Sequence, residues 1–172
     1  MSGIPHRLRW AVEQLDVQPK DRVLEIGGGR GVAAALVCEL LTDGRLVGLD
    51  RSESAVKGAT ARNAGYVADG RARFVLGTLE GADLASEGPF DKVFAVNVNL
   101  FWTRDPAHEL DLIRGALAPE GTLRLFYEPP PAGQLGSLGA RVAATLAANG
   151  YAAETTTDPT ETVLCVAARK AA

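Results

Sequence analysis

Cysteine is scarce in this chain. Only Cys38 and Cys165 occur among its 172 residues, and each stands in an apolar run. Their spacing matches no metal-binding pattern, so we interpret both as reduced, buried small side chains and expect no metal site.

Long apolar runs and concentrated positive charge are also missing. No stretch approaches the ~20 apolar residues that a membrane span needs, and the N-terminus lacks the apolar core of a signal peptide. The 18 Lys and Arg residues are mixed along the chain with 21 Asp and Glu, which gives a net charge of −3. A general nucleic-acid or membrane binder needs a concentrated positive field. We therefore expect a cytoplasmic protein with neither partner.

What the chain does contain is an alternation of short apolar runs and helical patterns. Hydrophobic residues make up 47% of the sequence, and its length suits one domain over residues 1–172. Runs rich in Val, Leu and Phe predict strands that are covered on both faces. They span residues 22–26, 45–50, 72–77, 91–97 and 122–127.

Helices are predicted between and before these strands. An apolar stripe after Pro5 indicates an N-terminal helix within residues 1–17. Further helices are expected over 31–41, from the cap Ser52 to about 63, over 105–117 and over 135–148, and the proline-rich stretch 127–137 is expected to be a loop. Two last strand candidates, 151–157 and 161–170, leave no room for a helix between them and should pair antiparallel. This order predicts an open, mostly parallel sheet with helices on both faces.

A glycine-rich stretch follows the first strand. Gly27, Gly28, Gly29 and Gly31 stand between that strand and a helix, where open α/β sheets bind ligands. A tight turn alone could explain them. Asp50, however, ends the second strand about 20 residues further on, where a carboxylate can accept hydrogen bonds from ribose hydroxyls. The combination favours a nucleoside cofactor.

The spacing argues against a dinucleotide. A GxGxxG fingerprint that starts at Gly27 would put Val32 in the last glycine position. Glu25 would also repel a pyrophosphate, whereas it suits a ligand with a cationic amino-acid part. An NAD(P)-dependent oxidoreductase is therefore the less favoured alternative.

The motifs resemble those of class I S-adenosylmethionine-dependent methyltransferases. "VLEIGGGRG" resembles their first motif, "LVGLDRSESAVKGATARN" their second, "FDKVFAVNVNLFW" their fourth, and "LAPEGTLRLF" the turn before their fifth strand. The resemblance covers about residues 20–170. It implies a doubly wound, seven-stranded sheet of order 3-2-1-4-5-7-6 with strand 7 antiparallel. It also implies S-adenosyl-L-methionine as cofactor and an N-terminal helix over the cofactor side.

The resemblance assigns residues to the cofactor. Gly27, Gly28 and Gly29 would lie against its methionine part and ribose, Glu25 would anchor the turn, and Asp50 would hold the ribose hydroxyls. Gly31 and Arg51 belong to the same implied set. In place of the family's usual Asp after the third strand the chain has "GTLEGAD", so Thr78 and the backbone of Leu79 are expected to serve the adenine, and the Asn97 carbonyl to receive the cofactor's amino group.

The acceptor side is less defined. "NVNLFW" differs from the Asp/Asn-Pro-Pro-aromatic sequence of enzymes that methylate exocyclic nitrogens, which makes transfer to DNA or glutamine less favoured. Asn99, Phe101, Trp102 and Tyr127 are candidates for the substrate pocket, although the aromatics could equally be packing residues. Glu128 is a candidate base or a solvated turn residue.

We therefore expect methyl transfer to a small molecule, with the alternative of a non-catalytic subunit that binds the cofactor or a partner. A homodimer could complete the pocket.

Overall fold

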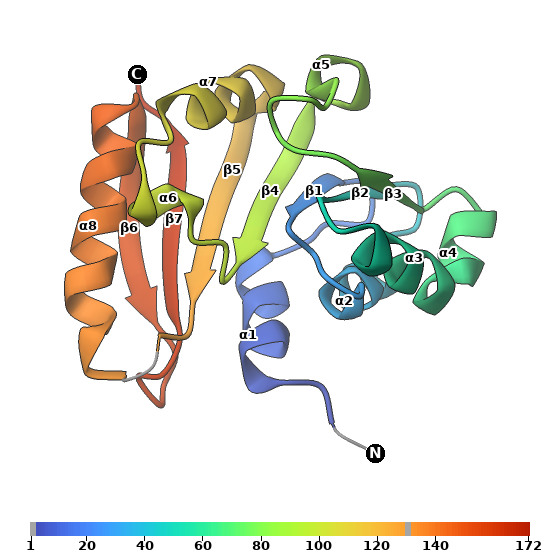
Figure 1. Ribbon diagram of the computed structural model, residues 1–172, viewed down its shortest axis with the longest axis horizontal. Helices are drawn as coiled ribbons and strands as arrows, with labels where there is room; N and C mark the ends of the chain where they lie inside the picture. The colour runs from blue at the N-terminus through green and yellow to red at the C-terminus, as the bar shows by residue number, and fades with distance from the viewer. Residues whose placement is uncertain (1–2, 130–131) are drawn as a thin grey trace.

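One seven-stranded sheet forms the centre of the protein. The computed structural model describes residues 3–129 and 132–172, and its strands follow the order β3-β2-β1-β4-β5-β7-β6 (Figure 1). Only β7 runs antiparallel to its neighbours. The strands are β1 (Arg22–Ile26), β2 (Arg45–Asp50), β3 (Ala72–Leu76), β4 (Phe90–Val96), β5 (Leu117–Tyr127), β6 (Tyr151–Thr157) and β7 (Leu164–Lys170). The predicted fold class and strand order are confirmed.

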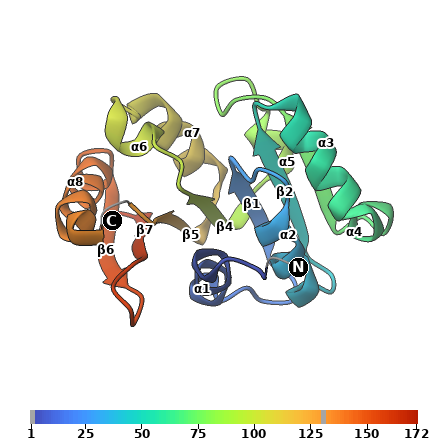
Figure 2. The same cartoon turned by 60° about the horizontal axis from the view of Figure 1, so that its bottom comes forward.

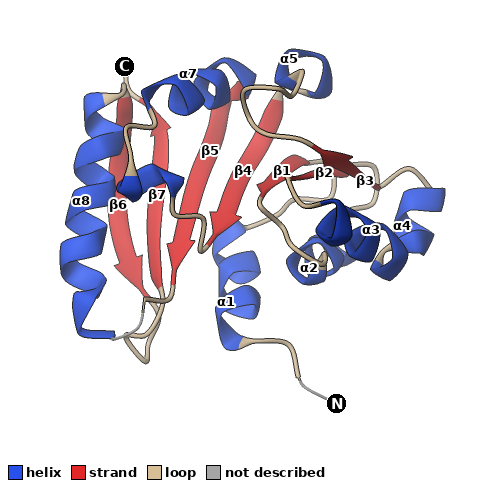
Figure 3. Cartoon of the chain, in the orientation of Figure 1, coloured by secondary structure: helices blue, strands red, loops and turns tan. Residues whose placement is uncertain are grey.

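Helices connect the parallel strands, as Figure 3 shows. The longer ones are α1 (His6–Leu15), α2 (Val32–Leu40), α3 (Glu53–Arg62), α7 (Ala107–Ala116) and α8 (Leu135–Ala148), and the short ones are α4 (Ala64–Ala68), α5 (Leu84–Glu87), α6 (Leu100–Thr103) and a 3-10 turn over Ala132–Gln134. Ser52 caps α3 as predicted, because its hydroxyl accepts a hydrogen bond from the Ala55 amide.

The two faces of the sheet carry different helices. Trp10 of α1 and Val37 of α2 pack against one face, together with Phe94 and Phe126 from the sheet. The apolar sides of α7 and α8 cover the other face. Figure 2 shows α1 and α2 on one side of the strands and α6 and α7 on the other. A sheet buried on both faces explains the continuous apolar runs of its central strands.

Three features differ from the sequence-based expectation. The short helices α4, α5 and α6 were not expected, and β5 begins at Leu117 rather than at residue 122. The stretch expected to be a loop over 127–137 contains the 3-10 turn and the start of α8, and residues 130–131 within it lie outside the described residues.

The winding of the sheet reverses between β1 and β4, which lie side by side. The carboxyl ends of these parallel strands share one edge of the sheet, where ligands bind in folds of this kind. Helix α1 packs against α2, β4 and β5.

In the described part of the chain, no helix is long and apolar enough to cross a bilayer, and no cluster of three or more His, Cys, Asp or Glu residues could hold a metal ion. Cys38 and Cys165 are both buried and unbonded.

Candidate functional site

A pocket of about 570 Å³ opens at the carboxyl edge of β1, β2, β3 and β4. Its volume lies in the usual range for small-ligand sites. Its lining brings together seven of the residues that the sequence singled out: Gly27, Asp50, Arg51, Thr78, Leu79, Asn97 and Asn99.

Gly27 is the residue of the glycine turn that lines this pocket, and the turn is held by two hydrogen bonds to β2. The Gly27 amide donates to the Leu49 carbonyl at 2.7 Å, and the Gly29 amide donates to Asp50 Oδ2 at 3.0 Å. Asp50 Oδ1 accepts a further hydrogen bond from the Ser52 amide at 2.9 Å. The Asp50 carboxylate therefore fixes the turn while its side chain lines the pocket.

Each glycine of the turn has its own structural reason. Gly27, Gly29 and Gly31 have φ values of 65°, 57° and 79°, which favour glycine. A Cβ at Gly28 would lie 2.7 Å from the Glu25 carboxyl carbon. At Gly31 it would lie 2.9 Å from the backbone of Ala59 in α3, so Gly31 serves helix packing. Among the four glycines of the turn, only Gly29 would accept a Cβ with no atom within 4 Å.

Glu25 lies beneath the turn with its carboxyl group buried. Its side chain is 3% exposed, and Oε2 finds no hydrogen-bond partner among the described residues. Burial, and then the neighbouring Asp50 carboxylate, raises the pKa of Glu25 to about 8. A buried carboxyl group with an unused acceptor fits a site for a cationic ligand group.

Thr78 and Leu79 lie on the β3 side of the pocket. Gly77 donates its amide to the Asp50 carbonyl at 2.9 Å, which ties the end of β3 to β2. The Thr78 hydroxyl accepts from the Gly81 amide at 3.2 Å, so it helps to shape the loop after β3.

Sequence reasoning missed a charged cluster in the same pocket. Glu109 from the first turn of α7 is 1% exposed and pairs with Arg104, which lies 3.7 Å from Glu80. Burial opposes ionisation of Glu109, but contacts with Glu80, its own backbone and Arg104 hold the pKa of that carboxyl below its usual range. A sequence signal existed, because Glu109 precedes Ile113 by four residues on the buried stripe of α7.

The ends of β4 and β5 are joined by side-chain hydrogen bonds. Asn97 adopts a φ of 56°, and its Oδ1 accepts from the Glu128 amide at 2.9 Å. The Tyr127 hydroxyl donates to the Val98 carbonyl at 3.0 Å, and burial raises the pKa of this phenol. Tyr127 is 3% exposed. It therefore supports the β4–α6 connection rather than facing the pocket.

Besides Tyr127, two more of the expected substrate residues do not line the pocket. Phe101 is fully buried in the core. Trp102 packs against the same core and lies under the Arg141 guanidinium, 6.0 Å from the ring centroid. The structure thus brings Asn99 to the pocket but gives Phe101 and Trp102 packing roles.

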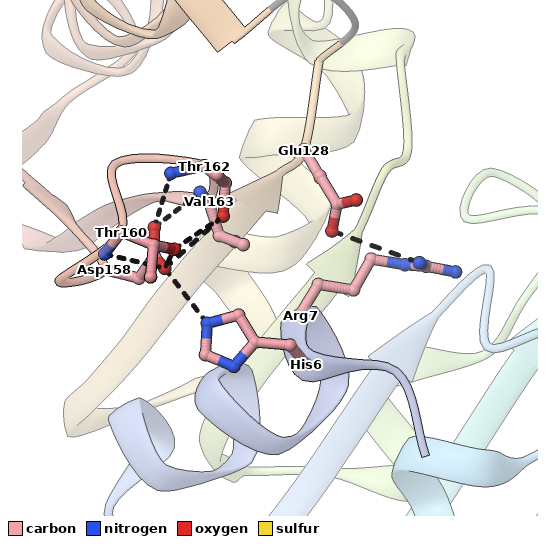
Figure 4. Close-up of polar contacts among 7 residues, drawn as sticks. All are labelled: His6, Arg7, Glu128, Asp158, Thr160, Thr162 and Val163. Carbon is pink, nitrogen blue, oxygen red and sulfur yellow. Dashed lines mark hydrogen bonds and ion pairs between the residues drawn. The ribbon is translucent and has the colours of Figure 1, made fainter. Parts of the chain in front are cut away.

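The first turn of α1 contacts the β6–β7 loop and the residue that follows β5. His6 Nε2 lies 3.0 Å from Asp158 Oδ2 in the β6–β7 loop, and Arg7 Nη1 lies 4.0 Å from Glu128 Oε2 (Figure 4). Asp158 also accepts hydrogen bonds from Thr160, Thr162 and Val163, and although burial opposes its ionisation, these contacts hold its pKa well below the usual range. Helix α1 is therefore anchored beside Glu128.

Comparisons with known proteins agree with this architecture. Residues 24–123 match a family model described as a methyltransferase domain. An uncharacterized methyltransferase of Bacillus subtilis (strain 168), YdaC, is 30% identical over 121 residues, which cover 70% of this chain and 64% of that protein.

Many solved structures share the fold, and two of them are similar over nearly the whole chain. The precorrin-6y C5,15-methyltransferase of Geobacter metallireducens GS-15 has a TM-score of 0.73 at 18% identity, with 95% of this chain and 87% of that chain covered. A Haloferax volcanii protein in complex with the Trm112 methyltransferase activator has a TM-score of 0.77 at 20% identity, with 97% and 90% covered.

The chain therefore belongs to the methyltransferase family. Its strand order identifies it as a class I member, and the cofactor of that class is S-adenosyl-L-methionine.

Proposed function

We propose that this protein transfers the methyl group of S-adenosyl-L-methionine to a small-molecule acceptor. The observation that carries the proposal is the pocket at the β1/β4 switch point. There a glycine turn is held by Asp50 and backed by the buried carboxyl group of Glu25, whose Oε2 has no hydrogen-bond partner among the described residues. The pocket volume of about 570 Å³ suits a nucleoside cofactor with a small acceptor beside it.

In our proposal, different residues bind the methionine, ribose and adenine parts of the cofactor. The turn from Gly27 to Gly29, with Glu25 behind it, holds the methionine part, and the Asn97 carbonyl receives its amino group. The remaining lone pairs of Asp50 accept hydrogen bonds from the ribose hydroxyls, and Arg51 lies next to Asp50 in the lining of the pocket. The adenine lies against Thr78 and Leu79. Gly31 takes no direct part, because its contacts are with α3.

The cofactor supplies an activated methyl group on a sulfonium, which an acceptor displaces in line. The protein then has to align the acceptor and exclude water, and a base is optional. Glu128 and Asn99 are the acceptor-side candidates that remain available. Glu128 is about 42% exposed on its side chain and touches Arg7 only at 4.0 Å. Glu128 is thus the residue that we propose for accepting a proton from the nucleophile.

A second candidate is a non-catalytic or partner-dependent subunit. It is favoured by the acceptor side, where Phe101, Trp102 and Tyr127 all have packing or support roles. The Haloferax volcanii relative, which forms a complex with a methyltransferase activator, makes partner-dependent activity a concrete form of this alternative.

The test is calorimetric titration with S-adenosylmethionine, followed by a screen of small acceptors for formation of S-adenosylhomocysteine. Binding with turnover supports the first candidate, and binding without any turnover supports the second. If the native protein shows turnover, Glu128→Gln should lower the turnover rate about 100-fold and leave cofactor affinity unchanged. Full activity of this variant would remove Glu128 from the reaction.

A further inference from the structure

Two carboxyl groups approach the glycine turn: that of Glu25 lies next to Gly28, and that of Asp50 binds the Gly29 amide. The Asp50 side chain accepts hydrogen bonds at both of its oxygens, from the amides of Gly29 and Ser52. No such donor reaches the buried Oε2 of Glu25 from residues 3–129 or 132–172. Burial disfavours the charged form of a carboxyl group, and a nearby carboxylate disfavours it further, so both effects favour a protonated Glu25.

The surroundings of Glu25 offer no compensating cation among the described residues that act on it. Asp50 on β2 opposes its ionisation, and opposite Glu25 in the sheet stand Gly48 of β2 and Phe94 of β4. On the α2 side Cys38 is the titratable neighbour, and burial raises the pKa of its thiol to about 12, so it is neutral. Burial and Asp50 together account for the raised pKa of Glu25, about 8.

The position of Glu25 links this proton to the ligand. A Cβ on Gly28 would lie within 3.0 Å of both oxygens of the Glu25 carboxyl group, so the carboxyl group sits directly behind the backbone of the turn. A cation on the other side of this turn is separated from Glu25 by protein rather than by water. Charges interact more strongly through protein, because its effective dielectric constant is lower. A bound cation therefore supplies the positive charge near Glu25 that the described residues around it do not provide.

We propose that Glu25 is protonated in the cofactor-free protein and ionises when the cationic methionine moiety of S-adenosylmethionine occupies the glycine turn. The step breaks the O–H bond of the Glu25 carboxyl group and passes the proton to the buffer, and no other bond changes. This inference rests on the proposed function, since it takes the glycine turn as the cofactor site. Cofactor binding is then coupled to the release of one proton.

The experiment is titration calorimetry with S-adenosylmethionine at pH 6.5, in buffers of different ionisation enthalpy. At this pH the amino group of the ligand is fully protonated, because α-amino groups titrate near 7.7–8.0. The slope of the measured enthalpy against the buffer enthalpy gives the number of protons released. We expect nearly one for the native protein. A slope of zero with intact binding would overturn the inference.

Two variants complete the test. Glu25→Gln keeps the shape of the protonated side chain and should bind the cofactor with almost no proton release. Glu13→Gln makes the same substitution at an exposed position of α1 and should release as many protons as the native protein. Equal release from Glu25→Gln and native protein would assign the proton to another group and overturn the inference.

A second readout does not depend on any variant. The affinity of the native protein for S-adenosylmethionine should rise up to tenfold per pH unit between pH 6 and 7.5, because one proton must leave on binding. Constant affinity over this range would contradict the inference. If the cofactor does not bind in any buffer, the proposed function fails as well, whereas binding without proton exchange leaves that function intact.

Discussion

The buried carboxyl of Glu25 makes the stability of the cofactor-free protein depend on pH. Its pKa rises from 4.5 to about 8 on folding, so the folded state favours the protonated form. The stabilisation is complete below the unfolded value and is lost as the pH rises through the folded value. Glu25→Gln cannot ionise and therefore escapes this loss.

The magnitude follows from the shift. Each pKa unit corresponds to about 1.4 kcal/mol, so the full effect is about 5 kcal/mol well above pH 8. Between pH 5 and pH 8 the Glu25 contribution changes by about 3 kcal/mol. For a domain of this size, such a change moves the melting temperature by about 6–12 °C.

Urea denaturation of native protein and Glu25→Gln at pH 5 and pH 8 measures the effect. We expect the stability of the variant relative to the native protein to increase by about 3 kcal/mol between the two pH values. Glu13→Gln controls for the loss of a carboxylate at the surface and should leave the difference constant. Parallel pH curves for the native protein and Glu25→Gln would refute the reasoning, because they would mean that Glu25 ionises as readily in the fold as in the unfolded chain.

Three further predictions concern the site and its support. Asp50→Asn should weaken S-adenosylmethionine and S-adenosylhomocysteine alike by about ten- to a hundredfold in calorimetry, since both carry the same ribose; unchanged affinity would exclude the carboxylate. Trp102→Ala should cost about 3 kcal/mol in urea denaturation through lost packing, with cofactor affinity retained, and a raised Michaelis constant at native stability would instead return Trp102 to the acceptor pocket. Asp158→Asn should flatten the acid limb of the stability curve below about pH 4, because the pKa of Asp158 is depressed and its contribution is lost as the pH falls; an unchanged limb would show that His6 and the loop amides do not depend on its charge.

Much of the fold could be predicted because its signals are local. Continuous apolar runs mark strands covered on both faces, and Asp158-Pro159 leaves room only for a tight connection between β6 and β7. The cap at Ser52 is equally local. In contrast, α5 and α6 have four residues each, which is too short for a helical period to be visible. The start of β5 at Leu117 depends on pairing with Phe90, a contact that the sequence does not state.

The candidate site shows the same division. The sequence could place Gly27 and Asp50 at one pocket because they stand at the carboxyl ends of β1 and β2, which meet at one edge of the sheet. The aromatic candidates Trp102 and Tyr127 do not line the pocket. Whether an aromatic residue near the end of a strand faces a pocket or packs inward depends on the segments that lie beside it in the fold. Trp102 lies against the helix that carries Arg141, and Tyr127 bonds to the Val98 carbonyl. Both partners are far away in the sequence.

The glycine turn shows why motif and mechanism should be separated. Positive φ values account for Gly27 and Gly29, the Glu25 carboxyl accounts for Gly28, and packing on α3 accounts for Gly31. Glycine content alone would therefore not require a ligand. The unsatisfied feature of the turn is electrostatic. The Asp50 carboxylate is bound to backbone amides, whereas the Glu25 carboxyl group is buried behind the turn, and its Oε2 has no partner in the part of the chain that the structure describes. A cationic ligand resolves this arrangement, so the case for the cofactor rests on Glu25 and Asp50 as much as on the glycines between them.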